Sequence, residues 1–147
     1  MNNPTTDELI NTDSYRSDEW ILKTFEDYFD PCPLNDNPIF DGLKIDWKKK
    51  TFVNPPYSNP LPWVKKAIEE SNKGNHIVML LKMDTSTKWF KELQEAGAKF
   101  LWINGRLYYR SSRNTYNGNI PGPSPFPSMF VILESKIKQA LEGKKYE

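Results

Sequence analysis

Four apolar runs along the chain predict four strands. Residues 76–82 (HIVMLLK) are apolar almost throughout, which is typical of a central parallel strand covered on both faces. Shorter apolar runs at 51–53, 99–103 and 129–133 predict three further strands. The run at 51–53 is followed closely by a pair of prolines, so its strand is expected to end there.

Amphipathic segments between these strands predict helices. The first helix is expected to begin at a cap formed by Ser58 or Asn59, and the second at Thr85 or Ser86. Apolar side chains at helical spacing are expected to face the sheet: Leu61, Val64 and Ile68 from the first helix, and Trp89, Phe90, Leu93 and Ala96 from the second. A last helix is expected over 135–141. This order of elements predicts an α/β fold with an open, mostly parallel sheet and helices packed on its faces.

The N-terminal region is expected to contain a loose segment and then a helix. Residues 1–16 are rich in Asn, Thr and Asp and are expected to form a flexible arm, while residues 17–147 are expected to form a single domain. Ser17 is a predicted N-cap. The side chains expected near one face of the short helix that follows are Trp20, Thr24, Phe25 and Tyr28.

Composition narrows the class of protein. A chain of 147 residues suits a single hydrophobic core. Five Trp, seven Tyr and eight Phe are more large rings than such a core buries completely, so some are expected to line a ligand site. The net charge of +1 argues against a protein that coats nucleic acid, but it is compatible with a local basic patch.

Cysteine usage and hydropathy indicate the compartment. The single cysteine, Cys32, excludes an intramolecular disulfide and argues against a cysteine-based zinc site, so no metal is expected. The first residues lack the apolar core of a signal peptide, and no apolar run is long enough to span a bilayer. These features predict a cytoplasmic protein without a membrane partner.

The segment that follows the 51–53 strand, Asn54-Pro55-Pro56-Tyr57, contains the main candidates for catalysis. Ligands of open α/β sheets bind beyond the carboxyl ends of the strands, where this segment is expected to lie. The Asn54 side-chain oxygen and the Pro55 carbonyl are adjacent acceptors for the two hydrogens of a planar amino group. Accepting both hydrogens pulls the nitrogen toward tetrahedral geometry and points its lone pair outward. The prolines make the turn rigid, so the acceptors are aimed before substrate arrives.

Tyr57 offers a ring on which a planar base can stack, an interaction worth roughly 1–3 kcal/mol per base. Because flipping a base out of a duplex also costs a few kcal/mol, this stacking is large enough to help hold an extruded base. The alternative is that Pro55-Pro56-Tyr57 is a strand-terminating turn or a ligand of a WW-type domain. Its place between an apolar strand and a capped helix favours an active site that acts on a planar amino or amide nitrogen.

Residues 104–127 show no regular pattern, and loops of that length in a compact domain are usually functional. Arginines are interleaved there with tyrosines, a mixture that suits phosphate contact and base stacking. We therefore expect Arg106, Tyr109, Arg110 and Arg113 to contact nucleic acid. The alternative is a solvated loop, in which arginine is common.

Short motifs follow one another through nearly the whole chain. They are Asp18-Glu19-Trp20, Asp30-Pro31-Cys32-Pro33, Asp41-Gly42-Leu43, Trp47, Phe52 to Ser58, Trp63, Met79-Leu80-Leu81, Thr85 to Phe90, Gly105-Arg106-Leu107 and Pro127-Ser128-Met129. In this order they resemble the phage-type DNA N6-adenine methyltransferase family. The resemblance implies S-adenosylmethionine as methyl donor, adenine in DNA as acceptor, and a compact Rossmann-like methyltransferase fold. It also implies the cytoplasm of a bacterium or of a phage-infected host.

The resemblance further implies roles for individual residues. Asp30, Pro31 and Cys32 would lie on the cofactor side, in the place of the usual glycine-rich motif. Asp41 would contact the adenosine of the donor, and Asn54 would face the donor as well as the acceptor. Both aspartates also stand in ordinary turn sequences, and that alternative stays open.

Only about two dozen residues separate Asp30 from Asn54, too few for two further βα units before the catalytic strand. The cofactor half must therefore be abbreviated, and its pocket is either unusually open or closed by a second subunit of a homodimer.

Ser58 and Lys88 lie in the motifs that carry the resemblance and are expected to contact DNA. The adenine of this DNA is either flipped out of a duplex or taken from a single strand. Two alternatives are a catalytically silent nucleic-acid-binding module of this fold, and an N-methyltransferase acting on RNA or protein glutamine.

Overall fold

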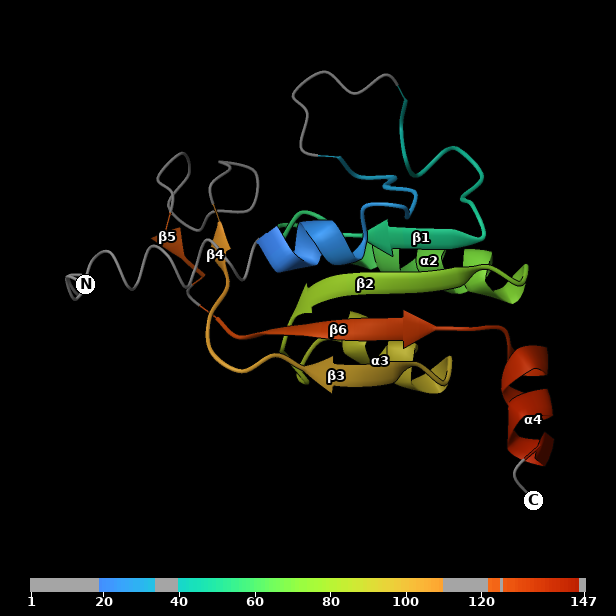
Figure 1. The fold of residues 1–147 in the computed structure, drawn as a ribbon. Helices are drawn as coiled ribbons and strands as arrows, with labels where there is room; N and C mark the ends of the chain where they lie inside the picture. Colours follow the sequence, from blue (N-terminus) through green and yellow to red (C-terminus); the bar gives the residue numbers. More distant parts are fainter. Residues whose placement is uncertain (1–18, 34–39, 110–121, 125, 146–147) are drawn as a thin grey trace, which may run out of the picture.

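The computed structural model of the protein describes residues 19–33, 40–109, 122–124 and 126–145 (Figure 1). The expected arm at 1–16 and the predicted cap Ser17 lie outside these ranges. Within them, no helix combines the length and the apolar character needed to cross a membrane.

Four strands form the main sheet. Their order across the sheet is β1 (Lys50–Val53), β2 (His76–Lys82), β6 (Ser128–Leu133) and β3 (Lys99–Trp102). β1 pairs with β2 in parallel, whereas β6 is antiparallel to both β2 and β3. The carboxyl ends of β1, β2 and β3 therefore lie at one edge of the sheet, where the arrowheads of these three strands point the same way (Figure 1). We call this edge the carboxyl edge.

The reversed direction of β6 corrects the expected mostly parallel sheet. Three strands do share one direction, but among the named strands of the described residues only β1 and β2 pair in parallel. The physical reason lies in the connection from β3 to β6. The chain leaves β3 at the carboxyl edge and enters β6 from that same edge, so β6 runs antiparallel to β3.

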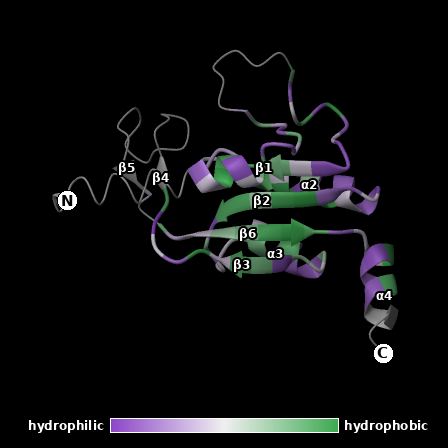
Figure 2. Cartoon of the chain, in the orientation of Figure 1, coloured by the Kyte–Doolittle hydropathy of each residue, from purple (hydrophilic) through white to green (hydrophobic). Residues whose placement is uncertain are grey.

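The apolar run of β2 is explained by burial on both faces. Ile77, Met79 and Leu81 belong to a main core, whereas Val78 and Leu80 belong to a second cluster on the opposite face. Strands β2 and β6 are accordingly the most uniformly hydrophobic elements (Figure 2). This confirms the prediction of a central strand covered on both sides, with the antiparallel β6 as one neighbour.

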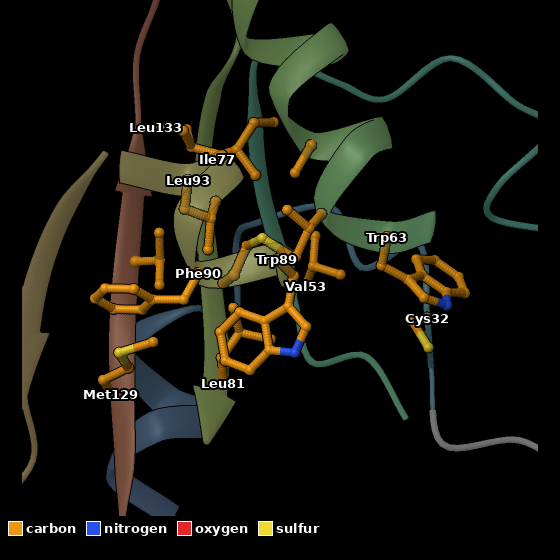
Figure 3. Close-up of a cluster of buried hydrophobic side chains, with 14 of the residues drawn as sticks. Cys32, Val53, Trp63, Ile77, Leu81, Trp89, Phe90, Leu93, Met129 and Leu133 are labelled. Atoms are coloured by element: carbon orange, nitrogen blue, oxygen red, sulfur yellow. The ribbon is translucent and has the colours of Figure 1, made fainter. Parts of the chain in front are cut away.

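Two helices cover one face of the sheet and form the main core. They are α2 (Leu61–Asn72) and α3 (Lys88–Glu95), which lie behind the sheet in Figure 1. Their buried apolar side chains meet the strands there: Trp63, Val64, Ala67, Trp89, Phe90 and Leu93. Figure 3 shows Trp63, Trp89, Phe90 and Leu93 among these side chains. The expected apolar faces are thus confirmed, with Leu61, Ile68 and Ala96 partly buried at the margin.

The opposite face of the sheet is covered by a helical segment at 19–24, which differs from the expected one. Ile21 is its buried residue, and Trp20 is 43% exposed. Phe25 lies after the helix, with its ring stacked on Phe52 at 4.2 Å. The helix ends before Tyr28, so Tyr28 cannot share a helical face with Trp20 as predicted.

The predicted cap of α2 is wrong. The N-cap position is held by Pro60, and neither Ser58 nor Asn59 caps the helix. A second proline, Pro62, lies in the first turn. Prolines fix φ and have no N–H, so this helix start needs fewer acceptors than an ordinary one.

The predicted cap of α3 is displaced by one or two residues. Thr87 is the N-cap, and its Oγ1 accepts the Phe90 N–H at 3.2 Å. Ser86 instead donates its N–H and its hydroxyl to Asp84. Because Ser86 is committed to that turn, the helix begins after the next residue with a suitable oxygen.

Smaller elements complete the structure. β4 (Tyr108–Tyr109) and β5 (Gly122–Pro123) form a separate two-stranded antiparallel ribbon, which lies beyond the carboxyl edge (Figure 1). The chain continues from β6 into α4 (Lys136–Lys145), the expected last helix, which lies near the other end of the sheet. The site described below is therefore remote from the last helix.

A buried ionic cluster in α2 was not visible in the sequence pattern. Glu70 is fully buried, and its carboxylate lies 2.9 Å from Lys66 Nζ and 3.1 Å from Lys73 Nζ. Asn75 Nδ2 donates to the other carboxylate oxygen at 3.0 Å. Burial raises the pKa of Glu70, but the two lysines together outweigh burial and hold the pKa below its ordinary value. The carboxylate therefore stays ionised inside the fold.

We expect Glu70→Ala to destabilise the protein by about 2–3 kcal/mol, because it leaves a partly buried lysine without its partner. Glu69→Ala on the same helix is the matched control, since Glu69 is 65% exposed and lies 3.9 Å from Lys73. The control is expected to change stability by less than about 0.5 kcal/mol. Urea unfolding of the three proteins measures both values.

The same carboxylate predicts a pH dependence. A lowered folded-state pKa stabilises the fold fully above the ordinary value of 4.5, and this contribution is lost as the pH falls through the folded-state value. The stability gap between wild type and Glu70→Gln should therefore narrow below pH 4.5. A gap that widened on acidification would contradict this assignment.

Candidate active site

The predicted catalytic segment lies at the carboxyl edge, directly after β1. Val53 and Thr51 are fully buried, which fixes the strand from which the segment starts. Alternation along the strand places Asn54 on the same face as Phe52, and both line one cavity. The Asn54 Oδ1 atom is buried, and no donor in the described part of the chain reaches it. Three other buried side-chain oxygens of the described residues, on Glu92, Ser128 and Glu134, also lack a partner, but of the four residues only Asn54 lines this cavity, where a ligand could supply the donor.

The cavity beside Asn54 has a volume of about 250 Å³. Aromatic rings line it, from Phe25, Tyr28 and Phe52. Its acidic side chains are Glu26 and Asp30. We call it the Asn54 cavity. Aromatic walls with two carboxylates suit a ligand that has a planar ring system and a positive charge.

Three of the residues that the sequence assigned to the cofactor line this cavity, namely Asp30, Cys32 and Asn54. Asp30 Oδ1 accepts the Cys32 N–H at 2.9 Å, which holds the turn together. Cys32 is buried at one end of the main core, with Trp63 nearby in the same cluster (Figure 3). The structure thus brings residues of two distant segments to one place.

A backbone bridge explains how Asp30 reaches Asn54 without further strands. The Phe29 N–H donates to the Lys50 carbonyl at 2.9 Å, and the Phe52 N–H donates to the Phe29 carbonyl at 2.9 Å. Phe29 therefore pairs in parallel with Thr51 as a one-residue extension of the sheet. In the described residues, this bridge occupies the edge of β1 where a longer sheet would continue.

Pro31 and the Asp41-Gly42-Leu43 segment pack against each other. A Cβ at position 42 would lie 1.8 Å from the Pro31 carbonyl oxygen, so only glycine fits this approach. Trp47 Nε1 donates to the Gly42 carbonyl at 2.7 Å and fixes the turn from the other side. Pro31 is buried in this contact and does not line the Asn54 cavity.

Asp41 lies on the outside of the same turn. Its Oδ1 accepts the Leu43 N–H at 3.0 Å, and its Oδ2 is 4.0 Å from Lys44 Nζ. The side chain is half exposed and does not line the Asn54 cavity. Its contact with the adenosine stays a prediction.

Tyr57 is half-buried at the carboxyl edge. Its ring packs against that of Phe126 in a T-shaped arrangement, with centroids 4.5 Å apart and planes at 87°. A small cavity of about 50 Å³ lies on the same segment, lined partly by Pro55, Pro56 and Tyr57. Lys82, at the end of β2, also lines it.

The predicted DNA contacts are only partly within the described residues. Ser58, Lys88 and Arg106 are exposed, and they follow β1, β2 and β3 respectively at the carboxyl edge. Arg110 and Arg113 lie outside the described ranges. The backbone of Tyr109 belongs to β4, and its side chain is outside the described part.

Several residues of the site escaped the sequence analysis. Alternation would have placed Phe52 on the face of Asn54, since the two are two residues apart in one strand. No such periodicity could have identified Glu26 and Phe126, because both lie in turns outside any helix or strand. Among the described residues, no group of three His, Cys, Asp or Glu side chains is arranged to hold a metal ion.

Comparison with known proteins gives the chain its family. The family model described as DNA N-6-adenine-methyltransferase (Dam) matches residues 11–141. The DNA N-6-adenine-methyltransferase of Haemophilus phage HP1 is 34% identical over 134 residues, which cover 80% of this chain and 76% of that protein. The protein of the same name from Escherichia phage T1 is 44% identical over 109 residues, 64% of this chain and 46% of that protein.

No solved structure shows a significant match to the chain. The sheet, the helices on its faces and the carboxyl-edge site are consistent with a methyltransferase fold of mixed α/β class. Since the family model spans all but the ends of the sequence, the chain belongs to the DNA N-6-adenine-methyltransferase (Dam) family.

Proposed function

We propose that this protein transfers a methyl group from S-adenosylmethionine to the N6 amino group of adenine in DNA. The observation that supports this most directly is the Asn54 Oδ1 atom, which is buried without a donor in the described residues beside a cavity of about 250 Å³. An amino group of a bound base supplies the donor that this acceptor lacks. Family membership supports adenine in DNA as the acceptor.

Asn54 and the Pro55 carbonyl hold the amino group. Both are acceptors, so they orient the two N–H bonds and leave the nitrogen lone pair pointing away from them. Their geometry is fixed in advance, because Val53 is anchored in the core and the prolines restrict the turn. Such preorganised polar groups stabilise developing charge without reorganising during the reaction. Tyr57 supplies the ring on which the base stacks.

The Asn54 cavity fits the methyl donor chemically. The donor supplies a methyl group activated by a positively charged sulfur. Glu26 and Asp30 provide negative charge for the positive groups of such a ligand, and Phe25, Tyr28 and Phe52 provide aromatic surface for its adenine ring. A complete cofactor site usually measures roughly 300–1,000 Å³, so this cavity holds part of the donor. The remainder is exposed or covered by a second copy of the chain in a homodimer.

We further propose that the fold is Rossmann-like with an abbreviated cofactor half. The Phe29 bridge takes the place of the extra strands at the edge of β1. The DNA lies along the carboxyl edge, where the exposed Ser58, Lys88 and Arg106 are available for its phosphates.

Because the cavity is smaller than a complete cofactor site, the second candidate function is that of a nucleic-acid-binding module without catalysis. Titration calorimetry with S-adenosylmethionine, with and without DNA, distinguishes the two. No binding under either condition favours the module. Nucleoside and peptide analysis after incubation with DNA, RNA and glutamine-containing protein identifies the acceptor, and methyl groups found only in RNA or protein would overturn the assignment to adenine in DNA.

We expect Asn54→Ala to lower the methylation rate of adenine-rich DNA at least about 100-fold, as loss of one preorganised polar contact does in other enzymes. The dissociation constant for S-adenosylmethionine is expected to stay within about threefold of wild type. Asn59→Ala is the matched control, because Asn59 is an exposed asparagine of the same loop. A methylation rate in Asn54→Ala equal to that of the wild type would contradict the catalytic role of Asn54.

We expect Asp30→Ala to weaken S-adenosylmethionine binding roughly tenfold, because a charged hydrogen-bond partner is worth about 1.5 kcal/mol or more. Asp27→Ala is the control, since Asp27 lies in the same segment but pairs with Lys50 outside the cavity. Calorimetry measures the affinity of the wild type, of Asp30→Ala, of Asp27→Ala and of Asp41→Ala. A loss of affinity in Asp41→Ala as large as in Asp30→Ala would extend the donor site to the Asp41 turn.

A further inference from the structure

Lys82 connects the end of β2 to the aromatic residues of the candidate active site. Its side chain lines the small cavity together with Pro56 and Tyr57. The Lys82 Nζ atom lies over the Phe126 ring, 5.6 Å from the centroid. Phe126 in turn packs at 87° against Tyr57, with centroids 4.5 Å apart. A cation–π contact and a ring contact thus join Lys82 to the ring proposed to hold the base.

The ammonium group of Lys82 is itself held in place. Its Nζ lies 3.4 Å from Asp84 Oδ2, and the Lys82 side chain is 37% exposed. Asp84 accepts hydrogen bonds from the Ser86 hydroxyl and the Ser86 N–H. These two bonds, followed by Lys82, keep the pKa of Asp84 below its ordinary value, so the carboxylate remains charged.

Hydrogen bonds also fix the backbone at Phe126 and at Pro127, the residue that follows it. The buried Ser124 hydroxyl donates to the Phe126 carbonyl at 2.8 Å, and the Phe126 N–H donates to that hydroxyl at 3.3 Å. The Met83 N–H donates to the Pro127 carbonyl at 2.9 Å, next to Lys82. Because the backbone is tied at both sides, the remaining freedom of Phe126 lies in its side chain, on which Lys82 acts directly.

We propose that Lys82 is a positioning residue for the acceptor base, acting through Phe126 to fix the orientation of the Tyr57 ring. The proposal rests on the proposed function, in which the base stacks on Tyr57. Stacking orients the base relative to Asn54 only if the ring itself has one orientation. The Phe126 contact fixes that orientation from one side, and Lys82 fixes Phe126.

A direct contact between Lys82 and a DNA phosphate is the competing role. The Asp84 carboxylate already balances the charge of Lys82 in the structure, which favours positioning over phosphate binding. The two roles differ in what they change. Loss of a phosphate contact weakens DNA binding and reduces its dependence on salt, whereas loss of positioning lowers the rate once DNA is bound.

The test compares Lys82→Met, which keeps the stem and removes the charge, with Lys82→Arg, which keeps a cation that stacks on aromatic rings. Lys82→Met is expected to lower kcat roughly five- to tenfold, in line with a partly desolvated cation–π contact. KM for DNA and the dissociation constant for S-adenosylmethionine are expected to stay within about twofold, and Lys82→Arg to recover most of kcat. Thermal unfolding of each variant verifies that the fold is intact.

Lys48→Met is the matched control, because Lys48 Nζ lies 5.2 Å from the Phe29 centroid in a similar contact remote from Tyr57. It is expected to leave kcat unchanged. A second pair of variants isolates the route: in a Phe126→Leu background, adding Lys82→Met should change kcat less than about twofold, since the intermediary ring is already gone.

Three outcomes would overturn the positioning role. They are a Lys82→Met protein with wild-type kcat, an equal loss in both backgrounds, and an effect confined to KM for DNA with a smaller salt dependence. Failure of the proposed function looks different, because wild-type protein would then methylate no adenine in DNA.

Discussion

Two backbone hydrogen bonds between Phe29 and β1 hold the N-terminal segment to the sheet. They help to fix Asp30 and Cys32 relative to Asn54, and residues 40–49, which lie between these segments in the sequence, form no strand. The bridge extends the sheet by a single residue, and the residues on either side of it, Tyr28 and Asp30, line the Asn54 cavity. The site is therefore assembled by main-chain geometry, with side chains added to a position that the backbone determines.

Much of the fold could be predicted because it follows from local patterns. The apolar run of β2, the amphipathic faces of α2 and α3, and the place of Asn54 after β1 all reflect periodicity or turn chemistry within a few residues. The direction of β6 could not be predicted in this way. It depends on where the chain re-enters the sheet after a long connection, and an apolar strand looks the same in either direction.

The features of the site that the sequence did not predict are contacts between residues that lie far apart in the sequence. Phe126 contacts Tyr57 across the sheet edge, and Glu26 reaches the cavity through a turn. The caps failed for a different reason. At α2, the prolines reduce the number of N–H groups that need a cap. At α3, Ser86 is hydrogen-bonded to Asp84 and is therefore not available as the cap, so competition among neighbouring polar side chains decides which residue caps the helix.

The Asn54 Oδ1 atom, which no donor reaches in the described part of the chain, also has a consequence for the evolution of the protein. A buried polar atom without a partner costs about 1–3 kcal/mol, and the folded chain bears that cost whenever no substrate is bound. Selection for thermostability alone would therefore favour an apolar residue at this position, against selection for activity. At the carboxyl edge, the requirements of stability and of function therefore oppose each other. The tightly packed core behind β1 contributes enough free energy of unfolding for the fold to tolerate such a site.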